Sequence, residues 1–273
     1  MSRTDWHSLF TGGRGPLIGM VHLPALPGAP MHDHHAGMTS IVDRARHDVD
    51  ALVEAGFDAV LFVNEGDAPY ANRADPSSAA AFTAVVARTA PTTIPFGVEF
   101  LFDPIASLSC AVATGASFIR AGVIGAWETT SGVRLGGAAD LLRARSALRA
   151  EHIGVFSVAE AELAFPLSAV ALEQRVRTAA QEGAMDAVLV GGSLPGVAVD
   201  TGAAERVRAA VRQVIPVLAN SGVRSDTVLE VLANFDGCFV GSSIKAGSLH
   251  DPIDPTRARE LVAAAGPREV AAG

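Results

Sequence analysis

With 273 residues, 49% of them hydrophobic and 18% charged, the chain is large enough for a substantial core, and disorder is excluded for most of it. Its formal net charge of −8, without a basic face or stripe, argues against nucleic-acid binding. No apolar run reaches the roughly 20 residues that cross a bilayer, and residues 1–14 lack the pattern of an export signal, so we expect a cytoplasmic protein with no stable membrane insertion.

Short aliphatic runs alternate with alanine-rich stretches of helical period along the chain. The predicted strands cover residues 17–22, 59–64, 96–101, 118–123, 153–158, 187–190, 217–219 and 237–240. The predicted helices cover residues 40–55, 77–90, 105–114, 138–150, 168–182, 201–214, 227–233 and 254–265. Eight such pairs, with strands too apolar for one exposed face, are typical of a parallel sheet that helices cover.

This alternation favours a single (β/α)8 TIM barrel. A doubly wound open sheet shares the pattern, but it rarely needs eight repeats, and no G-x-G-x-x-G follows the first predicted strand. We predict one barrel domain over residues 1–273, with an N-terminal extension at 1–14 and a loose C-terminal tail at 266–273. In this fold the chemistry lies in the loops that follow the strands, so polar residues are sorted by that position.

Small polar turns follow the last three predicted strands. Barrels of this kind commonly bind phosphate after the seventh and eighth strands, through backbone N–H groups. The predicted phosphate-binding residues are Gly192, Ser221, Gly222, Gly241 and Ser242, with Lys245 beside them. Lys245 is the only lysine among 21 basic side chains, and an ammonium acts as a point charge on phosphate. The alternative is a surface lysine beside a helix start.

Carboxylates and a histidine follow the first three predicted strands. Glu65 and Asp67 can act as acid and base, or can hold a divalent metal together with substrate; alternatively, Asp67 caps a turn and Glu65 faces solvent. Glu99 ends the third strand, and an ion pair with Arg120 on the fourth would make it scaffolding. His22 ends the first strand, where a general acid or base role is open to it. The predicted catalytic residues are Glu65, Asp67, His22 and Glu99.

No metal site is predicted from the histidines alone, and no cofactor is firmly predicted. His32 and His34 can join a carboxylate from another loop in a zinc site, but they lie ten residues beyond the strand on which hydrolase barrels place such ligands. A mobile lid over residues 24–37 accounts equally well for this segment. Cys110 and Cys238 form neither a CxxC pair nor a disulfide framework, as expected in a reducing compartment.

The chain resembles the BtpA/SgcQ family in three motifs, which occur in the family's order. They are IGMVHLPALPGAP at residues 18–30, NEGDAPY at 64–70 and FVGSSIK at 239–245. The resemblance implies a TIM barrel of the ribulose-phosphate-binding class and a phosphosugar-like ligand. The family is named after a cyanobacterial factor needed for photosystem I accumulation and after a bacterial protein encoded with sugar-uptake genes.

The chain departs from this family pattern on one side of the predicted barrel. The family's E-N-F-G-D becomes VNEGD at 63–67, and an L-R-N-D pattern becomes LFDP at 101–104. We therefore predict a divergent member: a homo-oligomeric enzyme that acts on a phosphorylated sugar or nucleoside-like metabolite, with isomerase or lyase chemistry. The alternative is a non-catalytic assembly or stability factor for a membrane complex, of the photosystem I biogenesis kind.

Overall fold

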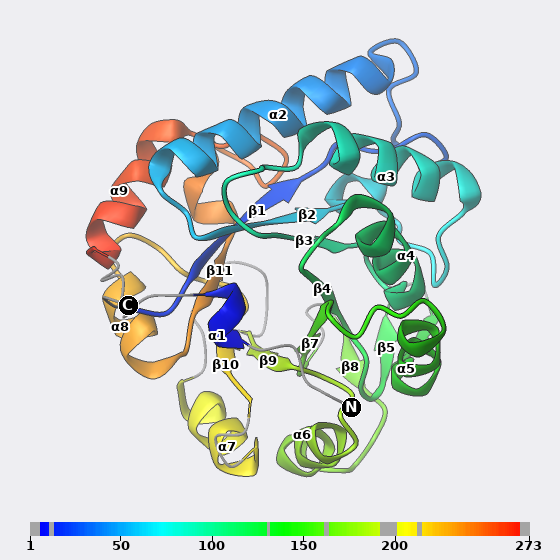
Figure 1. Ribbon diagram of the computed structural model, residues 1–273, viewed down its shortest axis with the longest axis vertical. Helices are drawn as coiled ribbons and strands as arrows, with labels where there is room; N and C mark the ends of the chain where they lie inside the picture. The colour runs from blue at the N-terminus through cyan, green and yellow to red at the C-terminus, as the bar shows by residue number, and fades with distance from the viewer. Residues whose placement is uncertain are drawn as a thin grey trace.

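The computed structural model describes residues 6–10, 14–129, 132–160, 164–191, 201–211 and 215–267. Eight parallel strands close into a barrel that helices surround (Figure 1). The barrel strands are β1 (Leu17–His22), β2 (Ala59–Val63), β3 (Phe96–Glu99), β4 (Phe118–Ala121), β7 (Gly154–Val158), β9 (Ala187–Val190), β10 (Val217–Ala219) and β11 (Cys238–Val240). The predicted TIM barrel is confirmed.

A helix follows each barrel strand and covers its outer side. These helices are α2 (Gly37–Ala55), α3 (Pro76–Thr89), α4 (Pro104–Thr114), α5 (Ala138–Ala147), α6 (Leu172–Gln181), α7 (Thr201–Val211), α8 (Val228–Asn234) and α9 (Pro255–Ala265). Asp75, Asp103 and Asp254 cap α3, α4 and α9 through side-chain oxygens that accept backbone N–H groups, and each is followed by a proline at the first helical position. No described helix is long and apolar enough to cross a membrane.

Side chains alternate between the two faces of every barrel strand. Ile18 and Met20 of β1 pack inside the barrel with Phe118, Phe156 and others, whereas Leu17 and Val21 pack outward beneath the helices. The parallel register pairs Ile18 with Ala59 and Met20 with Leu61, so equivalent positions of neighbouring strands form inward layers. The same alternation carries the last residue of β1, His22, to the inner face.

The beginning of the chain packs against the amino-terminal end of the barrel. The short helix α1 (Trp6–Leu9) places the Trp6 ring 5.7 Å from that of Phe156, and the Phe10 ring lies 6.4 Å from that of Phe118. Phe118 and Phe156 stack at 4.6 Å inside the barrel. These residues of the expected extension therefore complete the inner core. Its residues 1–5 and 11–13, the predicted helix end at 212–214 and residues 268–273 of the predicted tail lie outside the described residues.

A second, smaller sheet was not predicted from the sequence. It consists of β5 (Ala126–Thr129), β6 (Gly132–Leu135) and β8 (Phe165–Pro166), in the antiparallel order β6-β5-β8. The first two strands belong to the segment after β4, and the third belongs to the segment after β7. The sheet lies beside α5 and α6 in Figure 1.

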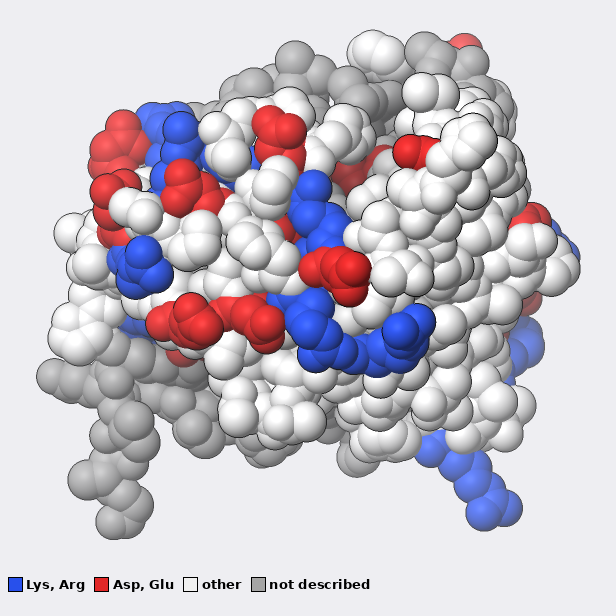
Figure 2. All heavy atoms as spheres, turned by 90° about the horizontal axis from the view of Figure 1, so that it is seen from above, with Lys and Arg blue, Asp and Glu red and all other residues white. Residues whose placement is uncertain are grey.

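In Figure 2, acidic and basic side chains lie interspersed on the face shown, rather than separated by sign.

Candidate functional site

The barrel interior changes from apolar to polar at the carboxyl ends of the strands. His22 ends β1, Glu99 ends β3, Arg120 lies in β4 and Asn220 follows β10, and all four are buried. Each of the first three lies two residues beyond an inward position, so strand alternation alone directs it inside. Parallel strands bring their carboxyl ends to the same end of the barrel. We call these four residues the polar layer.

Arg120 links three strands of the polar layer. Its Nε donates to Glu99 Oε2 at 2.5 Å, and its Nη1 donates to Asn220 Oδ1 at 3.1 Å. The guanidinium also lies 5.5 Å from the centre of the Phe239 ring. The pairing with Glu99 that we considered from the sequence is therefore present, and it holds both side chains in place. A catalytic role for Glu99 stays a prediction.

Within the polar layer, His22 is the residue with a buried side-chain atom that has no partner among the described residues. Its Nδ1 is buried and has no hydrogen-bond partner among the described residues. Burial, together with the charges of Lys245 and Arg120, lowers the pKa of His22 well below its ordinary value of 6.5. The imidazole is therefore neutral near pH 7. A Cβ at Gly241 would lie 2.9 Å from His22 Cε1, so glycine is needed for this close approach.

Glu65 and Asp67 lie in a short 3-10 helix, η1 (Glu65–Asp67), but their carboxylates have different partners. Asp67 is buried, and it accepts hydrogen bonds from Leu26 N at 2.8 Å and from Asn64 Nδ2 at 2.9 Å. Burial raises the pKa of Asp67. Glu65 is half-buried, and its Oε1 accepts from the Tyr70 hydroxyl at 3.2 Å. The two predicted partners in acid-base chemistry therefore make different contacts.

Asn64 is a functional candidate that sequence reasoning missed. Besides donating to Asp67, its Oδ1 accepts from Leu101 N at 2.7 Å. Through Asn64 and Asp67, the segments that follow β1, β2 and β3 are joined into one wall of the barrel mouth. The signal in the sequence was the polar residue directly after a fully apolar strand. Its partners lie on other loops, which strand periodicity does not indicate.

The two predicted phosphate turns follow adjacent strands. β10 pairs with β11 in parallel, with Ala219 opposite Cys238. The turns at 220–222 and 241–243 therefore lie at the same end of the barrel. Gly222 has a φ of +74°, which glycine adopts without strain. Ser242 is exposed, whereas the Oγ of Ser243 is buried without a partner among the described residues. Gly192 lies outside the described residues.

Lys245 does not occupy the place expected for it. Its side chain is fully buried, and Nζ lies 3.0 Å from Asp48 Oδ2 on α2, so it is neither a surface lysine nor a group that faces the barrel mouth. We correct the predicted phosphate contact accordingly: the ammonium already has a buried carboxylate as its partner. Asp48 lies among the buried residues of α2. An acid on an apolar helix face was the signal for this pair, because such a charge needs a partner.

The histidines of the predicted lid make local contacts. His32 Nδ1 lies 2.8 Å from the Ala25 carbonyl oxygen, and the rings of His32 and His34 meet edge to face at 4.9 Å. Asp33 accepts hydrogen bonds from the backbone N–H groups of His35 and Ala36. In the part of the chain that the structure describes, no three His, Cys, Asp or Glu side chains lie close enough together to hold a metal ion.

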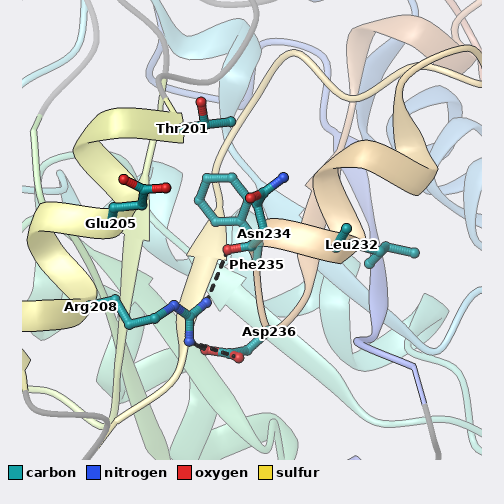
Figure 3. Close-up of a pocket in the computed structure, with 8 residues that line it drawn as sticks. Thr201, Glu205, Arg208, Leu232, Asn234, Phe235 and Asp236 are labelled. Atoms are coloured by element: carbon teal, nitrogen blue, oxygen red, sulfur yellow. Dashed lines mark hydrogen bonds and ion pairs between the residues drawn. The ribbon is translucent and has the colours of Figure 1, made fainter.

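A groove of about 320 Å³ lies outside the barrel, between α7 and α8 (Figure 3). Two of its charged side chains pair with each other: Arg208 Nη1 lies 3.0 Å from Asp236 Oδ2, and Arg208 Nη2 donates to the Asn234 carbonyl. Asp236 in turn accepts from Val217 N, at the amino-terminal end of β10. The groove is therefore at the opposite end of the strands from His22, and we place the functional site at the polar layer.

Known proteins resemble this chain along nearly its full length. The BtpA family model matches residues 14–266. The putative sgc region protein SgcQ of Escherichia coli K12 is 33% identical over 94% of this chain and 97% of its own length. The photosystem I biogenesis protein BtpA of Synechocystis is 30% identical, with 91% and 87% covered.

A solved structure shares the fold at low sequence identity. Phosphoribosyl anthranilate isomerase from Thermus thermophilus superposes with a TM-score of 0.54 and 16% identity, over 91% of this chain and 97% of that one. This likeness concerns the barrel alone. The family match and the two relatives show more: the chain belongs to the BtpA family.

Proposed function

We propose that this protein is an enzyme that binds a phosphorylated small molecule at the carboxyl ends of the barrel strands and uses His22 to transfer a proton. The observation that carries the proposal is the neutral, buried imidazole of His22, whose Nδ1 has no partner among the described residues. A buried polar atom without a partner is costly. Such an atom inside the mouth of an enzyme barrel is best explained by a ligand that completes its hydrogen bonding.

In this proposal the phosphate binds at the two adjacent turns. Backbone N–H groups at the turns after β10 and β11 bind a dianion, together with the hydroxyls of Ser221 and Ser242. Because residue 241 is a glycine, this turn lies close to His22. The close approach fits a small substrate whose reacting carbon lies within a few bonds of its phosphate.

Isomerase or lyase chemistry suits the remaining groups. A neutral imidazole accepts a proton from carbon beside a carbonyl and returns it elsewhere. Arg120 is held rigidly by Glu99 and Asn220, and its Nη2 donates no hydrogen bond to a described residue. Nη2 is thus available to stabilise an oxyanion that forms as the proton leaves. Glu65 at the rim is the second acid-base candidate, and the hydrogen bonds of Asp67 favour a role in holding the loops.

Ligand binding tests the first half of the proposal. Inorganic phosphate and a panel of phosphorylated sugars should raise the melting temperature, and calorimetry should give one site. Ser242→Asp introduces a carboxylate at the exposed turn, so it should abolish this binding. Ser146→Asp, the same change at an exposed position of α5, should leave binding intact. If no phosphorylated compound stabilises the wild-type protein, the phosphate site is wrong.

The test of proton transfer does not require the product to be identified. Each stabilising compound is incubated with the protein in D2O, and loss of a C–H proton signal is followed by NMR. His22→Gln should slow this exchange by roughly 100-fold or more, as expected on removing a general base, while phosphate binding persists. Exchange that continues at the wild-type rate would exclude His22 as the base.

The non-catalytic alternative has different support. It rests on the name of the Synechocystis relative, a photosystem I biogenesis protein. An assembly factor requires no ligand in the barrel mouth and no exchange of substrate protons. The two experiments above therefore separate the alternatives.

A further inference from the structure

The outer face of the small sheet is apolar and exposed. Cross-strand partners share a face, and the register places Leu135 opposite Ala126, and both Val133 and Phe165 opposite Glu128. Leu167 N donates to Ala126 O at 2.9 Å, so Leu167 extends the first row. Leu135 is 75% exposed, Phe165 74%, Leu167 51% and Val133 49%. We call this surface the sheet face.

The inner side of the same sheet is already packed. Trp127 is buried beneath the Arg175 guanidinium, 5.0 Å from its ring centre, and Arg134 lies 4.3 Å from the Phe102 ring centre. Apolar side chains on the outer side are therefore not needed to attach the sheet to the barrel. The outer side nevertheless carries large apolar side chains, which is typical of a sheet covered on both sides. In the described residues this second side is left uncovered.

We propose that the sheet face is the centre of a dimer interface, on which a second copy of this chain packs face to face. Several clustered side chains of this size form an apolar patch of a few hundred Å², larger than isolated surface residues provide. That area suits the apolar core of an ordinary interface of about 800 Å² per partner. Two copies present equal faces, which can stack as packed sheets do.

The charges on the sheet face agree with a two-fold axis near Ala126. Glu128 is the acid on this face, two residues along β5 from Ala126, and it has no ion pair among the described residues. We place the axis along the row formed by Leu135, Ala126 and Leu167. This row of one copy then packs on the same row of the other copy. This arrangement leaves the two Glu128 carboxylates on opposite sides, so like charges do not meet. Two-fold dimers with one self-complementary patch are the commonest assemblies.

Sedimentation of the full chain tests the dimer. Wild-type protein should sediment as a dimer at micromolar concentrations, and Leu135→Glu and Phe165→Glu should each weaken self-association by roughly 30-fold or more, as for a central interface residue. Leu229→Glu is the matched control, because Leu229 is 65% exposed on α8, on the other side of the barrel (Figure 1). All three changes are at exposed positions, so folding should be retained, which circular dichroism checks.

Cross-linking locates the contact. The chain's two cysteines are buried, so Leu135→Cys adds the accessible thiol, and a short bismaleimide should then link two copies. Leu229→Cys should not be linked. A monomeric wild type would mean that a different protein covers the sheet face, or none, and would overturn the inference. A dimer that survives both glutamate variants, or equal linking at Leu229, would overturn it too. None of these results depends on the proposed enzyme activity.

Discussion

Removing the charge of Lys245 should unfold this protein at a markedly lower temperature. Lys245 and Asp48 have fully buried side chains 3.0 Å apart, and Asp48 Oδ1 also accepts Ile253 N at 2.8 Å. Lys245→Met keeps the shape of the side chain but leaves a buried carboxylate with the Ile253 amide and the weaker contact from Arg44 at 3.4 Å. Breaking such a pair costs about 3–5 kcal/mol. For a chain of this size the melting temperature should fall by roughly 10 °C.

Urea denaturation of single and double variants measures this effect. Lys245→Met with Asp48→Asn removes both charges and retains an acceptor for Ile253 N, so the double variant should be more stable than the sum of the two single losses predicts. Asp226→Asn breaks the exposed ion pair with Arg224 and should change stability little. A loss below about 1 kcal/mol for Lys245→Met, or simple additivity in the double variant, would refute the buried-pair reasoning.

Three further outcomes are expected. The pKa of His22 lies well below 6.5 in the folded state, so the unfolded state binds more protons below pH 6.5, and the free energy of unfolding falls as the pH decreases through this range. His22→Gln should flatten this decline in urea titrations at several pH values. An unchanged slope would contradict the assignment. Burial raises the pKa of Cys110 to about 11 and that of Cys238 to about 12, so neither thiol should react with a disulfide reagent at pH 8 until the protein is unfolded; rapid native labelling would show that burial to be wrong. Gly241→Ala should displace the His22 ring, seen as a change in its NMR signals and weaker phosphate binding, whereas Gly122→Ala, where a Cβ meets nothing within 4 Å, should change neither.

The sequence was informative wherever one residue's surroundings depend on its own strand or helix. The alternation of eight aliphatic runs with helical stretches predicted the barrel, and the period of two along a strand carries His22, Glu99 and Arg120 to the inner face at the end of their strands. The position of glycines after strands likewise predicted turns at the barrel mouth. These features follow from local geometry, which the chain specifies before any long-range contact forms.

The hydrogen-bond and ion-pair partners of these side chains could not be predicted from the sequence, because the partners lie on distant segments of the chain. The lone lysine looked like an anion contact, and only the packing of α2 against the turn after β11 shows that Asp48, 197 residues away, is its partner. The small sheet joins Glu128 to Phe165 from separate loops, and neither loop carries a strand pattern of its own. Residue spacing thus determined the barrel and the inward layer, whereas long-range packing alone decided which polar groups are already satisfied and which, like His22 Nδ1, have no partner among the described residues.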